Sequence, residues 1–254
     1  MNTIAAELIK LKRSQSVTVV ILLPILIVGV GTFNTVLSGE QLQNGWHTLW
    51  LRTVVFHGLF PLALGVALLA SLIWKPEHDR GNWNLLMSGR APALRIVVAK
   101  TSVVALLTAA MQVLMVATVL VVGTLLFELD GPLPTPLWIA AGLSIFAAVP
   151  LAAVQSALSM LLGSFAVPIA LALVGAGMSA FLLTADVGAA IFVLPHALVS
   201  RATQLATGTF GDGGSLTAAS TLSVVGATIF LSAVAIVGSS RILDRRDGRG
   251  PCSA

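Results

Sequence analysis

The sequence predicts an all-α integral membrane protein with six transmembrane helices. Of its 254 residues, 57% are hydrophobic and 9% are charged, whereas about 25% of the residues in a soluble domain are charged. The mean hydropathy is +0.98. Six apolar runs are each long enough to cross the hydrocarbon core of a bilayer, which takes about 20 residues of helix. We therefore expect a single transmembrane domain over residues 1–254.

The chain begins with an amphipathic segment, residues 1–16. Apolar side chains such as Leu8 lie on one side of a helix here, and charged ones lie on another. This pattern favours a helix in the membrane interface, with its lysines facing anionic headgroups. A basic flank of the first span is an equally open alternative. The charged residues of this segment are Glu7, Lys10, Lys12 and Arg13.

Polar segments separate the six predicted spans. Before the second span, Trp46, His47 and Trp50 suit an aromatic belt at the membrane surface. The segment 184–215 is too apolar for a free loop, but its apolar run is too short to cross the bilayer. We expect two short re-entrant helices there, with a plain loop as the alternative, and a basic tail over 239–254. The predicted spans are residues 17–37, 54–74, 101–127, 137–162, 165–183 and 216–238.

The positions of the basic residues predict the orientation. Residues 1–16, 75–100 and 239–254 hold three, five and four Lys and Arg, which makes twelve, whereas the remaining segments hold only Arg52 and Arg201. Cytoplasmic loops carry the excess of Lys and Arg. Both termini and the segment 75–100 are therefore expected in the cytoplasm, with 184–215 outside. Because the basic residues gather at span ends, the net charge of +4 does not indicate a nucleic-acid partner.

The segment 75–100 is the longest polar interruption of the chain. Beginning at Trp83, four residues with large side chains recur at i, i+3, i+4 and i+7, which places them on one face of a helix. The charges around them have both signs, whereas helices that rest on a membrane prefer Lys and Arg. We expect a soluble partner to dock here, with a helix resting on headgroups as the alternative. The expected contact residues are Glu77, Arg80, Trp83, Leu86, Met87 and Arg90.

No site of covalent chemistry is evident in the sequence. It has no Gly-rich phosphate-binding loop, so we expect no ATP site of its own, and its four histidines are dispersed without metal-ligand spacing. The single Cys252 forms no intrachain disulfide. Serines such as Ser156 and Ser159 are expected to join helices rather than to act as nucleophiles. The spans carry no Asp, Glu, Lys or Arg away from their ends, which argues against a carrier driven by protons or sodium ions.

Three polar residues within the spans are candidates for a transport pathway. His57 is the one titratable candidate, and a position in the outer interface is its simpler explanation. Gln112 and Gln155 lie well inside their spans, where a buried amide must face other helices. Such residues line a pathway or, more often, hold a helix bundle together.

These features together resemble the ABC-2-type permeases, and more narrowly the group of lantibiotic-immunity and antibiotic-export permeases of bacteria. In the first helix, AELIKLKRS, the matching residues are Glu7, Lys10, Lys12 and Arg13. In the segment 75–100 they are Glu77, Trp83, Leu85, Leu86, Pro92, Arg95 and Lys100. The sequence GRAP before Arg95 departs from the leucine-rich approach to the proline that is usual in the family, which leaves the end of this helix open.

The resemblance implies that this chain functions together with separate protein chains. The segment 75–100 would form a coupling helix that fits a groove on a separate ATPase, and the first helix would be a connecting helix along the membrane. Two permeases, identical or homologous, would pair above two ATPases, which bind ATP and Mg while this chain binds no cofactor. The implied setting is the bacterial cytoplasmic membrane, and the implied activity is export. Few polar groups and no fixed charge line the spans, so the expected substrate is amphipathic or hydrophobic: an antibiotic, peptide, drug or lipid-like molecule.

Two other functions remain open from the sequence. A membrane anchor or sensor would use the segment 75–100 to bind a cytosolic regulator without ATPase activity. A lipid-modifying enzyme would need acidic or histidine residues gathered at one depth, and the spans lack such a set.

Overall fold

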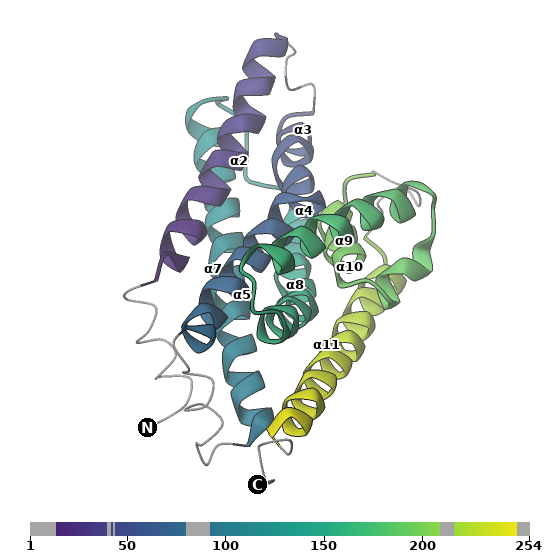
Figure 1. Cartoon of the computed structure of the whole chain (residues 1–254). Coiled ribbons are helices and arrows are strands. Elements are labelled where there is room, and N and C mark those ends of the chain that lie inside the picture. The colour runs from purple at the N-terminus through teal and green to yellow at the C-terminus, as the bar shows by residue number, and fades with distance from the viewer. Residues whose placement is uncertain (1–13, 40–41, 43, 80–91, 209–215, 248–254) are drawn as a thin grey trace, which may run out of the picture.

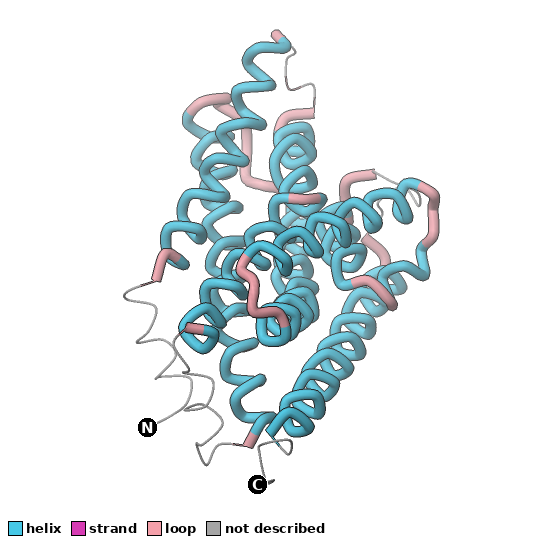
Figure 2. Tube along the Cα trace, viewed as in Figure 1, coloured by secondary structure: helices cyan, strands magenta, loops and turns pink. Residues whose placement is uncertain are grey.

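The structure, a computed structural model, describes residues 14–39, 42, 44–79, 92–208 and 216–247, and within these ranges it contains helices and loops but no strand (Figures 1 and 2). The long helices are α2 (Ser16–Ser38), α5 (Pro61–His78), α7 (Ala93–Leu125), α8 (Thr135–Leu161), α9 (Ala166–Thr184) and α11 (Ala218–Asp247). The short ones are α3 (Trp46–Trp50), the π-helix η1 (Leu51–Val55), α4 (Phe56–Leu59), the 3-10 helix η2 (Gly188–Phe192) and α10 (Pro195–Gln204).

The long helices account for the predicted spans. Five of them, α2, α7, α8, α9 and α11, are long and apolar enough to cross a membrane. The second predicted span corresponds to a bent pair, Trp46–Leu59 and Pro61–His78, which meet at 44° and bring the number of candidate spans to six when they are taken together. The bend lies where Pro61, which has no backbone N–H, starts α5 and where Phe60 leaves helical geometry with φ −128°. The expectation of an all-α integral membrane protein is confirmed.

Several helices extend beyond the predicted spans. The helix α7 begins at Ala93 rather than at Thr101, and α11 continues to Asp247. With 33 residues, α7 is about 50 Å long, whereas the hydrocarbon core is about 30 Å thick. Arg95 and Lys100, which suggested a loop because they are charged, therefore belong to the first turns of a projecting helix.

Two hydrophobic clusters hold the bundle together. The larger one contains buried residues of every helix named above except α4. The smaller one lies where the projecting ends of α7 and α11 meet (Figure 1). It consists of Trp74, Ala93, Ile96, Val97, Met160 and Leu243. This end of the bundle therefore has a core of its own.

The aromatic belt expected before the second span is wrong for its two tryptophans. Trp46 is 6% exposed and Trp50 is 0% exposed, because both pack inside the larger cluster. Trp46 also donates from Nε1 to the Gly131 carbonyl at 3.1 Å. The sequence could not distinguish a membrane-surface position from a buried one for these residues, since a tryptophan suits both environments.

The segment before the last span contains the two short helices that the sequence predicts, η2 and α10. Nine of the ten residues of α10 are buried, because this helix packs against α8 and α9 and also contacts α4. Its depth in the membrane stays a prediction.

Candidate functional site

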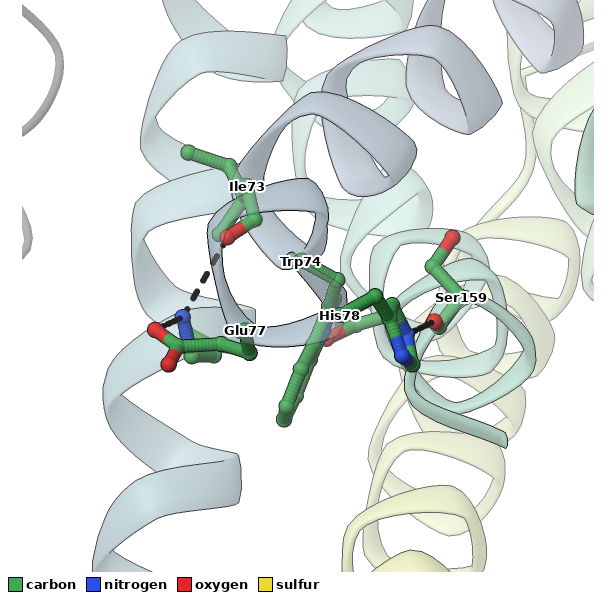
Figure 3. Close-up of polar contacts among 7 residues, drawn as sticks. Ile73, Trp74, Glu77, His78 and Ser159 are labelled. Carbon is green, nitrogen blue, oxygen red and sulfur yellow. Dashed lines mark hydrogen bonds and ion pairs between the residues drawn. The ribbon is translucent and has the colours of Figure 1, made fainter. Parts of the chain in front are cut away.

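A buried ion pair joins the two ends of the polar segment between α5 and α7. Lys100 Nζ lies 2.9 Å from Glu77 Oε1, donates to the Ile73 carbonyl at 3.2 Å and lies 4.7 Å from the centroid of the Trp74 ring. The exposed fractions of the Lys100 and Glu77 side chains are 1% and 6%. Figure 3 shows this arrangement at the last turns of α5. We call Trp74, Glu77 and Lys100 the clasp.

Helix geometry explains how residues 23 positions apart meet. Glu77 lies in the last turn of α5, and Lys100 lies two turns after the start of α7 at Ala93. Removing two charges from water costs free energy that their attraction repays only when further polar contacts satisfy them. The Ile73 carbonyl and the Trp74 ring supply such contacts to the ammonium group. The clasp therefore fixes the spacing between the end of α5 and the start of α7.

Hydrogen bonds tie the clasp to α8 as well. Trp74 donates from Nε1 to Ser156 Oγ at 2.8 Å, and Ser71 and Ser159 share a hydrogen bond of 3.3 Å between their hydroxyls. His78 donates from Nε2 to the Ser159 carbonyl at 2.8 Å, as Figure 3 shows. The expectation that Ser156 and Ser159 join helices is confirmed. The end of α5 is thus fixed to two neighbours, α7 and α8.

Most residues expected to dock a partner lie outside the described part of the chain. These are Arg80, Trp83, Leu86, Met87 and Arg90, together with Glu7, Lys10, Lys12 and Arg13 of the first segment. Glu77 is described, and its carboxylate faces Lys100 instead of the surface, so little of it is open to another protein. The docking surface itself stays a prediction.

Sequence reasoning missed the pairing of Glu77 with Lys100. The signal was present, because these residues are the first and last charged positions of the pattern shared with ABC-2-type permeases. The pattern gives their spacing along the chain, but only the antiparallel approach of α5 and α7 makes them neighbours.

The three candidate pathway residues are all buried, but their surroundings differ. Gln112 donates from Nε2 to Ser144 Oγ at 3.3 Å, which joins α7 to α8. His57 is 0% exposed, and the position in the outer interface considered for it stays a prediction. Within the described part of the chain, neither ring nitrogen of His57 and neither side-chain amide atom of Gln155 has a hydrogen-bond partner. Their role in a pathway stays a prediction.

The helix α10 adds further buried polar groups to this region. Both side-chain amide atoms of Gln204 lack a hydrogen-bond partner among the described residues, while Ser200 Oγ donates to the Gly58 carbonyl of α4 at 2.9 Å. We call His57, Gln155 and Gln204 the unpaired interior residues. His196 of α10 lies against Gly175 of α9, and burial lowers the pKa of its imidazole to about 4. No three His, Cys, Asp or Glu side chains in the described part of the chain are grouped as metal ligands.

Comparison with known proteins gives one match. A family model described as "ABC-2 family transporter protein" matches residues 3–179. This range covers the first four predicted spans, most of the fifth and the whole clasp. No curated protein and no solved structure gives a significant match.

Proposed function

The chain belongs to the ABC-2 transporter family, and from that premise we propose that it is the membrane-spanning subunit of an ATP-driven exporter with a separate ATPase. Permeases of this family are membrane components of transporters. The observation that carries the proposal is the clasp, because it fixes both ends of the segment that an ATPase would move. The narrower resemblance to antibiotic-export permeases supports export as the direction.

The proposed mechanism begins at the polar segment between α5 and α7. An ATPase that binds ATP and Mg would dock on the face carrying Trp83 and Met87 and shift it when its nucleotide state changes. The excess of Lys and Arg on this side supports a cytoplasmic position for the segment and for both termini. In a bacterium the protein would then lie in the cytoplasmic membrane.

The clasp would pass that shift to the spans. Because Glu77 and Lys100 are paired, the end of α5 and the start of α7 move together. Because Trp74 and His78 bond to α8, that helix follows. Three spans would therefore respond to one displacement, which is what alternating access between the two sides of a membrane requires. Two permeases, identical or homologous, would form the pathway between them above two ATPases.

The interior of the bundle supports an amphipathic or hydrophobic substrate. The core is mainly Val, Leu, Ala and Met, and a few buried polar groups, among them His57 and Gln155, could accept hydrogen bonds from a passing molecule. An antibiotic, peptide, drug or lipid-like compound fits these requirements.

Purification of the full chain from its host in mild detergent tests the proposal. A soluble ATPase should copurify in about equal amount, and should be lost when Trp83 and Met87 are replaced by alanine. Trp138→Ala is the matched control, because Trp138 is 49% exposed at the start of α8 and lies outside the segment between α5 and α7. An intact protein without a nucleotide-binding partner would contradict the exporter function and favour the anchor.

A further inference from the structure

A cavity separate from the clasp lies between α2 and the first half of the bent span. Its volume is about 360 Å³, and its walls come from the outer half of α2 and from η1 and α4. Arg52 and Asn34 line it together with apolar side chains, which include Val30, Phe56 and Leu59. Figure 1 shows α2 beside this region, away from the end where α7 and α11 meet.

The backbone on both sides shapes this cavity. On α2, Gly31 allows the helix to approach η1 so closely that a Cβ atom there would lie 2.7 Å from the Arg52 carbonyl oxygen. On the other side, Leu51–Val55 form a π-helix. The wider turn of a π-helix displaces side chains from their α-helical positions, and such turns are frequent at functional sites. Arg52 therefore belongs to a π-helical turn that packs closely against α2 at Gly31.

The depth and opening of the cavity indicate what it faces. Val30 is 56% exposed and Phe56 is 43% exposed, on helices that cross the membrane, so the apolar wall opens toward lipid tails. Asn34 lies four residues before the end of α2, which places it about 6 Å below that end along the helix. Because the 23 residues of α2 extend about 35 Å, slightly more than the hydrocarbon core, we expect Asn34 near the level at which acyl chains meet headgroups.

We propose that this cavity binds an anionic membrane phospholipid, with its phosphate at Arg52 and Asn34 and one acyl chain along Val30, Phe56 and Leu59. A guanidinium offers two parallel N–H donors that match phosphate oxygens, and an amide side chain adds another donor. The apolar wall gives the tail a surface that free phosphate cannot use. Binding of this lipid needs no ATPase and occurs in the resting protein.

Native mass spectrometry of the delipidated full chain in detergent tests this site. The probes are phosphatidylglycerol and phosphatidylcholine with identical acyl chains. The wild-type protein should retain phosphatidylglycerol with about tenfold higher affinity. Both lipids carry a phosphate, but the ammonium group of phosphatidylcholine offsets its attraction to Arg52, whereas phosphatidylglycerol keeps a net negative charge. Arg52→Gln should lower this affinity to that of phosphatidylcholine, and Arg52→Lys should give an intermediate value. Arg201→Gln is the matched control, because Arg201 is the other basic residue on this side and does not line the cavity.

Two further experiments distinguish a bound lipid from other occupants of the cavity. Val30→Trp fills the tail side of the cavity and should weaken both lipids alike. Inorganic phosphate, which has no tail, should not displace phosphatidylglycerol at equal concentration. Equal retention of phosphatidylglycerol by wild type and Arg52→Gln would overturn the site. Displacement of phosphatidylglycerol by phosphate would also overturn the site. So would a Val30→Trp protein that no longer forms a dimer but still binds the lipid, because a second copy of the chain would then be the occupant of this surface. Should Arg52→Gln fail to fold, Arg52→Lys and Val30→Trp still decide the result.

Discussion

The clasp and the unpaired interior residues are both buried and polar, yet they differ in how their polar groups are satisfied. In the clasp, Lys100 contacts a carboxylate, a carbonyl and an aromatic ring. Among the unpaired interior residues, the side-chain nitrogens and oxygens of His57, Gln155 and Gln204 have no hydrogen-bond partner among the residues that the structure describes. A buried polar group without a partner costs about 1–3 kcal/mol. The clasp is thus suited to hold a fixed arrangement, and the interior is suited to accept water, a ligand or a rearrangement.

The largest expected effect comes from removing half of the clasp. Lys100→Met would leave the Glu77 carboxylate buried without its cation, and we expect the free energy of unfolding to fall by about 3–5 kcal/mol. Thermal unfolding in detergent, followed by loss of the monodisperse protein, measures this.

The control for that variant is the double replacement Lys100→Met with Glu77→Leu. Because an apolar pair of similar volume can substitute for a buried ion pair, it should recover most of the stability. A Lys100→Met protein as stable as wild type would show that the clasp does not fix the ends of α5 and α7.

The next effect concerns the contact between α4 and α10. A Cβ atom at Gly58 would overlap the side chain of Thr203, so Gly58→Ala should separate the two helices and destabilise the protein by about 1–3 kcal/mol. Gly29→Ala is the control, because nothing lies within 4 Å of a Cβ atom there. Equal thermal unfolding of the two variants would mean that α10 adjusts freely against α4.

Two neighbouring residues of α8 test the comparison most directly. Ser156→Ala should cost about 1–2 kcal/mol, because Trp74 Nε1 loses its acceptor. Gln155→Leu should leave stability unchanged or raise it, since the amide has no partner to lose. Thermal unfolding of both variants in one detergent gives the ranking. The reverse ranking would show that Gln155 is satisfied in the membrane and that the two regions do not differ.

A smaller effect is expected from acid. His196 lies outside the six spans, and burial lowers its pKa from 6.5 to about 4. Between pH 6.5 and 4, His196 therefore binds a proton in the unfolded chain but not in the folded chain. The free energy of unfolding thus decreases as the pH is lowered through this window. From pH 7 to pH 5.5 the loss should be about 1 kcal/mol. His196→Gln should reduce this dependence; an unchanged pH profile in the variant would assign it to another group.

The sequence predicted the transmembrane helices well because long apolar runs without charge identify them from composition alone. Runs such as 17–37 contain no charge over the length of a bilayer, and the helix α2 covers Ser16–Ser38. The start of α7 at Ala93, before the predicted span, could not be predicted because a charged residue near a span end has the same sequence signal in a loop and in a projecting helix. Trp46 and Trp50 were misplaced because lipid and protein interior are both apolar, so composition does not tell which one a tryptophan faces.

The candidate site was predictable only in part. The polar segment between α5 and α7 was evident from its charges, but Glu77 was expected on the surface because carboxylates usually are. Its burial depends on Lys100, whose approach is set by the packing of α5 against α7. The partnerless state of Gln155 likewise depends on what surrounds it in three dimensions, which no local pattern encodes.

The bend at Pro61 gives the second span a mechanical property that the straight helices lack. Because Pro61 has no N–H, the backbone there cannot donate the helical hydrogen bond four residues back, so that bond does not resist a tilt of α5 about this point. The 18 residues of α5 form a rigid arm of about 27 Å. A tilt of α5 by about 10° at Pro61 would move the clasp, at the other end of the helix, by about 5 Å. This distance is close to the pitch of one helical turn.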